Sequence, residues 1–212
     1  SIKNQKIKEE LENSRITVML SQIQPHFLYN SLTSVMDLCD RNPKQAKAAI
    51  ADFADYLRGN LSSLKTENLI SFETELEHIE KYLRLEKLRF QEELNIVYDI
   101  QTQDFMLPTL SIQPLVENAI KHGLMGLETA GKVKVSSYET DKYYEVCVQD
   151  DGVGFDMNSG YDETKHVGIK NIRGRIEAMC GGTLTIESEI GKGTKATIRI
   201  PKEVQDYDSN NS

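Results

Sequence analysis

Residues 115–123 read LVENAIKHG, and residues 150–155 read DDGVGF. Apolar residues recur at helical spacing over 111–123, which predicts a helix with one apolar face. Asn118 and His122 are four residues apart, as are Glu117 and Lys121, so each pair shares a face of that helix. An Asn or Glu that faces a cleft could hold magnesium, a cation that prefers oxygen ligands. A solvated helix face with an ion pair would show the same residues.

The second stretch follows a predicted strand, in which Tyr144 and Val146 alternate with polar residues. Gly152 and Gly154 permit positive φ angles and let a ligand approach the main chain. Asp150, at the end of the strand, could accept a hydrogen bond from an exocyclic amine such as that of adenine. Ordinary turns also use such glycines, so this motif alone leaves both interpretations open.

The surrounding sequence predicts an α+β domain. Strands are expected near 94–100, 133–135, 144–148, 183–188 and 194–200, and a helix over 169–179 that ends at Gly181 and Gly182. The polar stretch 156–168 could be a lid over a nucleotide or a plain surface loop. The helix after it would offer free amides to phosphate. The stretch GKGT at 191–194 is predicted to be a turn, because a phosphate loop needs Ser or Thr directly after its lysine.

The first half of the chain predicts an all-helical hairpin or bundle. Asn42 and Pro43 are typical of a helix start, and Ser71 can cap a third helix with Glu73 and Glu75 in its first turn. Such narrow apolar stripes need a second copy of the chain to complete the bundle. The predicted stripes are Ile16, Leu20, Ile23 and Phe27; Ala46, Ile50, Phe53, Leu57, Leu61 and Leu64; and Phe72, Leu76, Ile79 and Leu83.

Residues 21–32 read SQIQPHFLYNSL. A proline inside a helix removes a backbone hydrogen bond, so a kink is expected at Pro25. Gln22, His26 and Asn30 fall on one polar strip, away from the apolar stripe. His26 should therefore face solvent, where its neutral imidazole could act as a nucleophile. An ordinary surface histidine would give the same pattern.

Composition narrows the possible functions. The chain has 212 residues, 39% of them hydrophobic, with a net charge of −8 and a pI near 5.1. This charge argues against a broad nucleic-acid surface. Cys39, Cys147 and Cys180 form no CxxC pair, so neither a zinc site nor a disulfide framework is indicated, and all three are expected to be buried. No apolar run is long enough to span a membrane. We expect a fragment of a longer protein, with a disordered tail over 204–212.

The order of these motifs resembles that of the sensor histidine kinases, and among them the LytS/YesM-like family with its QxxPHFLYN box. The resemblance covers about residues 16–201. It implies a multidomain protein: a helical dimerisation and phosphoacceptor domain over 1–91, and an ATP-binding α+β two-layer sandwich of the Bergerat (GHKL) type over 92–203. It further implies a homodimer that forms the cytoplasmic portion of a bacterial membrane protein. This portion would itself touch no membrane, because the upstream sensor region would be the embedded part.

The family resemblance also implies roles for individual residues. His26 would be the phosphoacceptor, Asn118 would hold Mg²⁺, and Asp150 would bind the adenine of ATP. The remaining residues that the resemblance places at the nucleotide are Lys121, His122, Gly152, Gly154, Gly168, Lys170, Asn171 and Thr194.

The implied reaction is ATP-dependent autophosphorylation of His26, followed by transfer to an aspartate of a response regulator. Many histidine kinases place an acidic residue directly after the acceptor, but this chain has Phe27 there. Glu117 is therefore our candidate base, and Asn30 could position a water for dephosphorylation of the regulator. Three alternatives stay open: a GHKL-type ATPase without an acceptor, a protein serine kinase, and a non-catalytic dimer scaffold.

Overall fold

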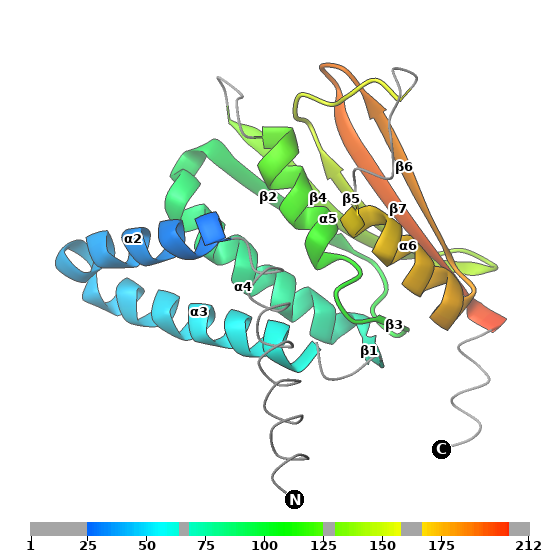
Figure 1. Cartoon of the computed structure of the whole chain (residues 1–212), viewed down its shortest axis with the longest axis horizontal. Coiled ribbons are helices and arrows are strands. Elements are labelled where there is room, and N and C mark those ends of the chain that lie inside the picture. Colours follow the sequence, from blue (N-terminus) through cyan, green and yellow to red (C-terminus); the bar gives the residue numbers. More distant parts are fainter. Residues whose placement is uncertain (1–24, 64–67, 125–129, 158–166, 204–212) are drawn as a thin grey trace, which may run out of the picture. The chain divides into compact units, whose positions relative to one another are not determined.

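The computed structural model describes residues 25–63, 68–124, 130–157 and 167–203. Compact packing divides the chain into two units, Ser1–Glu67 with Lys81–Arg89, and Asn68–Glu80 with Phe90–Ser212. The helix α4 (Phe72–Phe90) contributes to both units (Figure 1). The predicted domain boundary between residues 91 and 92 stays a prediction.

Helices α2 (Pro25–Arg41) and α3 (Pro43–Ser63) lie side by side in the first unit (Figure 1). The predicted start of α3 is confirmed, because Oδ1 of Asn42 accepts the backbone N–H of Gln45 at 3.2 Å. The connection between the two helices is a single residue, which makes them antiparallel neighbours as expected. Gln22, the first predicted stripe up to Ile23, and the chain before the expected kink lie outside the described residues.

An aromatic cluster holds the helical unit together. The ring of Phe27 lies 4.9 Å from the rings of both Tyr56 and Tyr82, and all three side chains are buried. Such tilted pairs add to the free energy gained by burying the rings. Ile50, predicted in the buried stripe, is instead 52% exposed, and the neighbouring Ala49 and Tyr56 form the buried side of α3.

The second unit is built on a five-stranded sheet with the strand order β2-β4-β5-β7-β6. The strands are β2 (Leu94–Ile100), β4 (Gly131–Glu139), β5 (Tyr143–Asp150), β6 (Thr183–Glu189) and β7 (Gly193–Pro201). Strands β2 and β4 are parallel, and the other neighbours are antiparallel.

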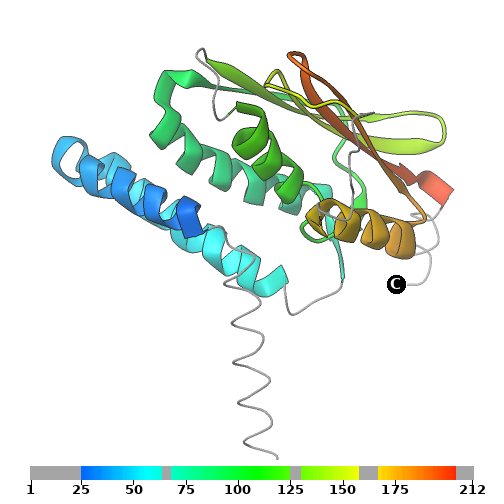
Figure 2. The same ribbon diagram turned by 45° about the horizontal axis from the view of Figure 1, so that its top comes forward.

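Helices α5 (Gln113–Asn118) and α6 (Val167–Cys180) lie on one face of this sheet (Figure 2). Ile176 of α6 and Ile198 of β7 are fully buried in the layer between them. The expected α+β two-layer sandwich, preceded in the sequence by an all-helical region, is therefore confirmed. Each predicted strand and helix of this half has a counterpart in the structure.

Helix α4 presents the predicted apolar stripe, and all four of its members, Phe72, Leu76, Ile79 and Leu83, are buried. Ser71 caps the helix, because its Oγ accepts the N–H of Thr74 at 3.2 Å. The sequence did not predict the short ladder that β1 (Leu69–Ser71) forms with β3 (Met106–Pro108). Strands of three residues are too short to show an alternating pattern. A single 3-10 turn, Gln91–Glu93, connects α4 to β2.

Glycines terminate two elements as predicted. Gly181 has a φ of 59° and its N–H donates to the carbonyl of Glu177 at 3.0 Å, which closes α6 with a left-handed cap. Gly191 and Gly193 have φ angles of 77° and 88° in the turn between β6 and β7. The turn predicted at GKGT is therefore confirmed.

Two further predictions concern the burial of the three cysteines and membrane-spanning segments. Cys147 and Cys180 are buried as predicted, but Cys39 is exposed in the last turn of α2. Within the described ranges, no helix has both the length and the apolar character needed to cross a membrane.

Candidate functional site

Asp150 ends β5 and is 4% exposed. Its Oδ1 accepts the backbone N–H of Gly152 at 2.9 Å and that of Thr194 at 3.2 Å. Burial raises the pKa of this carboxyl above its usual value, and the nearby charge of Asp151 acts in the same direction. The two N–H groups oppose that pKa shift. The result is a buried carboxylate whose direction is set by the main chain.

Glycines pack the main chain tightly around Asp150. A Cβ at position 123 would lie 2.5 Å from Oδ1 of Asp150, and one at position 152 would lie 2.0 Å from the carbonyl oxygen of Gly123. A Cβ on Gly193 would lie 2.0 Å from the carbonyl oxygen of Asp150. Gly154 has a φ of 59° and would meet the carbonyl of Glu189 at 2.0 Å. Only glycine fits at these positions.

Of these four glycines, the sequence predicted Gly152 and Gly154 as functional, but not Gly123 or Gly193. Gly123 could have been found, because a glycine inside a helical pattern destabilises the helix and often has a packing or functional reason. Gly193 gave no such signal, because a glycine is expected in the predicted turn at this position and therefore did not suggest a functional role.

The prediction of a regular helix over 111–123 is wrong for the second half of that segment. The α-helix ends at Asn118, and Ala119–Leu124 form a π-helical turn, a feature common at functional sites. The carbonyl of Gly123 accepts the N–H of Val153 at 3.0 Å, which joins this turn to the loop after β5. Because a π-helix closes its hydrogen bonds five residues apart, spacing by four no longer sets a common face for Asn118 and His122.

Within this helix and turn, Glu117 and Asn118 are half-buried, while Lys121 and His122 are exposed. Nε2 of Gln113 donates to Oε1 of Glu117 at 2.8 Å. Gln113 itself is buried, and the sequence did not mark it as functional.

Glu75 is a second residue that the sequence missed. It was expected only to favour the start of its own helix, but it is 1% exposed and its carboxylate accepts N–H groups of another segment. Oε1 accepts from Ile112 at 3.0 Å and from Gln113 at 3.3 Å, and Oε2 accepts from Leu110 at 3.1 Å. Burial raises the pKa of this carboxyl, and the three N–H groups oppose the shift.

The predicted residues at the start of α6 are exposed. Gly168, Lys170 and Asn171 lie in its first turns, and a Cβ on Gly168 would meet nothing within 4 Å. The remainder of the predicted lid, 158–166, lies outside the described residues. The backbone N–H of Thr194 donates to Oδ1 of Asp150, and the hydroxyl oxygen of Thr194 lies 2.9 Å from Oγ of Ser188. The structure thus brings Asp150, Gly152, Gly154 and Thr194 together.

His26 is exposed near the start of α2, as predicted. Nδ2 of Asn30 lies 3.0 Å from its Nδ1 and 3.3 Å from its Nε2, so these two residues share one side of the helix, as the polar strip predicted. The next residue, Phe27, points into the aromatic cluster, which turns the imidazole away from the core.

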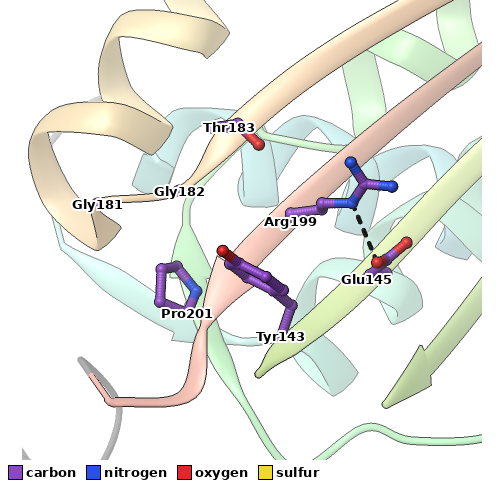
Figure 3. A pocket seen from close by; sticks show the side chains of 7 residues that line it. All are labelled: Tyr143, Glu145, Gly181, Gly182, Thr183, Arg199 and Pro201. Atoms are coloured by element: carbon purple, nitrogen blue, oxygen red, sulfur yellow. Dashed lines mark hydrogen bonds and ion pairs between the residues drawn. The ribbon is translucent and has the colours of Figure 1, made fainter. Parts of the chain in front are cut away.

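A pocket of about 350 Å³ lies at the other end of the strands (Figure 3). Tyr143 begins β5 and Pro201 ends β7, whereas Asp150 ends β5 and Gly193 begins β7. Inside the pocket, Nε of Arg199 donates to Oε1 of Glu145 at 3.0 Å (Figure 3). This pocket is therefore separate from the glycine-lined site. The positive charge of Arg199 inside it is balanced by the carboxylate of Glu145.

Two family models match the chain. The histidine kinase model matches residues 14–94, and the model for histidine kinase-, DNA gyrase B- and HSP90-like ATPases matches residues 106–204. The second match covers Asp150 and all four glycines around it. The nucleotide that this domain binds is therefore ATP.

Similar proteins match over most of the chain. YwpD of Bacillus subtilis is 36% identical over 88% of this chain and 72% of its own length. The sensor histidine kinase YpdA of Escherichia coli is 31% identical over 94% of this chain, and the sensor protein LytS of Bacillus anthracis 30% identical over 92%. The chain spans only 36% and 35% of the lengths of these two sensors.

Among solved structures, the blue-light activated histidine kinase EL346 of Erythrobacter litoralis has a similar fold. It aligns with a TM-score of 0.55 and 19% identity over 77% of this chain and 51% of that protein. The adjacent family matches, the named relatives and the glycine-lined Asp150 site lead to one conclusion. The chain belongs to the sensor histidine kinases of the LytS/YesM-like type, with a helical histidine kinase region followed by a GHKL-type ATPase domain.

Proposed function

We propose that this chain transfers the terminal phosphoryl group of ATP to its own His26 and then to an aspartate of a response regulator. The observation that carries the proposal is that the imidazole of His26 is exposed while Phe27 anchors the same turn in the core. An exposed neutral imidazole is a competent nucleophile near pH 7. Membership of a family that pairs a histidine kinase region with an ATPase domain supports this role.

The surroundings of Asp150 fit the adenine end of ATP. The carboxylate is buried and fixed by two N–H groups, so it can accept a hydrogen bond from an exocyclic amine without first reorienting. Gly152 leaves main chain, rather than a side chain, beside this carboxylate, and Gly154 does so beside the carbonyl oxygens of Glu189 and Gly193. A flat base can approach such a surface closely.

The phosphate end of ATP would lie against polar groups near the α5 turn and the start of α6. Free N–H groups at the first turn of α6, near Gly168, favour phosphate oxygens. Bound ATP and Mg²⁺ would supply the phosphoryl group and neutralise charge on its oxygens. We assign contacts with the nucleotide to Lys121, His122, Lys170, Asn171 and Thr194.

Asn118 is our proposed ligand for Mg²⁺. Its side chain is half-buried on the last turn of α5, and an amide oxygen suits this hard cation. Throughout the described part of the chain, no group of three or more His, Cys, Asp and Glu side chains could hold a metal ion. That fits magnesium bound through few protein ligands, because it keeps waters and phosphate oxygens in its shell.

Glu117 is our proposed base. A bond forms between a ring nitrogen of His26 and the terminal phosphorus as the bond from that phosphorus to the ADP oxygen breaks. The proton that leaves the imidazole goes to the carboxylate of Glu117. Phe27 occupies the place where many kinases carry an acid, and it is needed in the core. The base must therefore come from another element.

A second copy of the chain would complete the helical unit. Tyr29, Leu32 and Met36 recur at helical spacing on α2 and are 72%, 49% and 71% exposed, and Ile50 on α3 is 52% exposed. Exposed large apolar side chains in one stripe mark a surface for association. We propose that two hairpins cover these stripes and form a four-helix bundle.

Asn30 is proposed to position a water that dephosphorylates the regulator, since its amide already lies beside the imidazole of His26. Asn30→Ala should then slow the loss of label from a phosphorylated regulator. The measurement is the decay of regulator phosphate in the presence of each variant. An unchanged decay rate would remove Asn30 from the phosphatase reaction.

The full-length protein is proposed to be a membrane-associated sensor whose cytoplasmic portion is this chain. The support is the greater length of the related sensors, of which the chain spans about a third. The stimulus would act through segments preceding α2.

The test is incubation of the chain with labelled ATP and Mg²⁺. We expect acid-labile, alkali-stable label on the protein, with none in His26→Ala. His26→Ala should still bind ATP, whereas Asp150→Ala should lose both binding and label. Transfer of the label to a receiver domain tests the second step.

The other outcomes identify the alternatives. ATP hydrolysis without a phosphoprotein would indicate a plain ATPase. Acid-stable label on a second protein would indicate a serine kinase, and absence of nucleotide binding would indicate a scaffold. Each of these results would overturn the proposed histidine kinase activity.

A further inference from the structure

The side chain of Gln113 lies in the first turn of α5 and is 3% exposed. Its Nε2 donates to Oε1 of Glu117 at 2.8 Å, one helical turn further along. An amide carries no charge, so this bond sets the direction of the carboxylate without forming an ion pair with it. This bond therefore restricts the orientation of the proposed base.

The main chain at Gln113 is fixed from α4. Glu75 accepts the N–H groups of Ile112 and Gln113 with one carboxylate oxygen and that of Leu110 with the other. Ile112, the residue before α5, makes no side-chain cap, so Glu75 caps this helix in its place. Because Glu75 is 1% exposed, its carboxylate is shielded from bulk solvent.

Helix α6 supports the same segment from another side. Nη2 of Arg175 donates to the carbonyl of Leu110 at 2.8 Å. Arg175 also lies close enough to Glu75 for their opposite charges to interact. The positive guanidinium opposes the rise that burial causes in the pKa of the Glu75 carboxyl. The turn that begins α5 is thus held by one side chain from α4 and one from α6.

We infer that Gln113 is a positioning residue for phosphoryl transfer, which holds Glu117 in the direction needed to accept the proton from His26. The inference rests on the proposed function and adds a residue to it. Glu75 acts one step further back, because it fixes the main chain from which Gln113 extends.

The chemistry explains why such a residue is needed. A free glutamate side chain rotates about several bonds, and a base is effective only when its oxygen meets the departing proton. With Oε1 held by Gln113, the remaining oxygen has a defined direction. Loss of this bond should lower the rate of transfer and leave ATP affinity intact, because Glu117 is given no role in holding the nucleotide.

Gln113→Met tests this directly, since methionine fills a similar buried space without an N–H donor. Autophosphorylation should fall about tenfold or more in kcat, while KM for ATP stays within about twofold. The thermal midpoint should change little. An unchanged kcat, or a rise in KM alone, would overturn the inference.

A donor at the same position should rescue the rate. Gln113→His offers a ring N–H and should recover most of kcat, whereas Gln113→Glu presents an oxygen to Glu117 and should be as slow as the methionine variant. If the methionine variant fails to fold, this pair decides the question. Equal rates for the histidine and glutamate variants contradict the inference.

Glu117→Gln provides the coupling test. In that background, Gln113→Met should leave the residual rate unchanged, because no base remains to be positioned. Independent, multiplicative losses would overturn the inference. Failure of the proposed function is distinguishable, because it would appear as absence of label on His26 in the unmodified chain.

Discussion

Gly123 and Asp150 approach so closely that a Cβ at position 123 would lie 2.5 Å from Oδ1 of the carboxylate. That oxygen is not free to move aside, because it accepts two backbone N–H groups. Gly123→Ala should therefore displace Asp150 and weaken ATP binding by about tenfold or more, since a hydrogen bond to a charged group contributes about 1.5–3 kcal/mol. Titration with a fluorescent nucleotide measures the change.

Gly174 provides the matched control. It lies in α6, and a Cβ there would meet nothing within 4 Å. Gly174→Ala should keep the affinity for ATP and raise the free energy of unfolding by up to about 1 kcal/mol, because alanine favours helix more than glycine does. Equal affinities for the two alanine variants would show that Gly123 has no part in the site.

Asp150→Asn should make the protein more stable at neutral pH but a poorer binder of ATP. Burial raises the pKa of Asp150 in the folded state, so the folded chain binds this proton more tightly than the unfolded chain. Ionisation of Asp150 therefore opposes folding, and its contribution to stability declines as pH rises through the raised pKa. Asparagine has no such penalty, but its NH₂ group cannot accept a hydrogen bond from adenine.

Denaturant unfolding and nucleotide titration across pH test this prediction. As the pH is lowered, the unmodified protein should begin to lose ATP affinity at a pH that is still above 3.8, the ordinary pKa of an aspartate. A variant less stable than the unmodified protein at neutral pH would contradict the stated effect of burial.

Phe27→Glu should unfold the helical unit rather than supply the acid that many kinases carry after their phosphoacceptor. The ring of Phe27 is 3% exposed between Tyr56 and Tyr82. Removal of a buried phenylalanine costs about 3–5 kcal/mol, and a buried unpaired charge adds to that cost. Helix content by circular dichroism and the unfolding midpoint measure the loss.

Thr33→Glu is the control for added charge on α2, because Thr33 is exposed. It should change the free energy of unfolding by no more than about 0.5 kcal/mol. A folded Phe27→Glu variant with faster autophosphorylation would refute the account of why this chain lacks the acid.

Glu75→Leu and Glu73→Leu form another matched pair, two residues apart on the first turn of α4. Glu75 is buried and accepts three backbone N–H groups, whereas Glu73 is exposed. Buried donors left without acceptors cost about 1–3 kcal/mol each, so Glu75→Leu should lose at least about 2 kcal/mol of stability and Glu73→Leu less than about 1 kcal/mol. Chemical denaturation compares them. Similar losses would mean that the cap on α5 contributes nothing.

The sequence predicted the parts of this protein that depend on local patterns. Asp150, Gly152 and Gly154 follow an alternating strand, and the caps at Asn42 and Ser71 lie beside the helices they begin. Those signals span a few residues, so no knowledge of the folded chain is needed to interpret them.

Contacts between distant segments could not be predicted in the same way. Glu75 bonds to residues more than thirty positions away, and a glutamate in a first helical turn has the same local signature whether exposed or buried. The π-helical turn after Asn118 also left no mark, because the apolar spacing up to Ile120 fits an ordinary helix. This turn accepts the backbone N–H of Val153 at the carbonyl of Gly123, a contact that only the folded chain reveals.

The glycine-lined surface around Asp150 has a consequence for inhibitor design. At Gly123, Gly152, Gly154 and Gly193 any larger residue would collide with atoms that build the site. Consider a compound that binds only to this carboxylate and the adjoining peptide groups. Few single substitutions could then make the protein resistant to the compound without also destroying the ATP site.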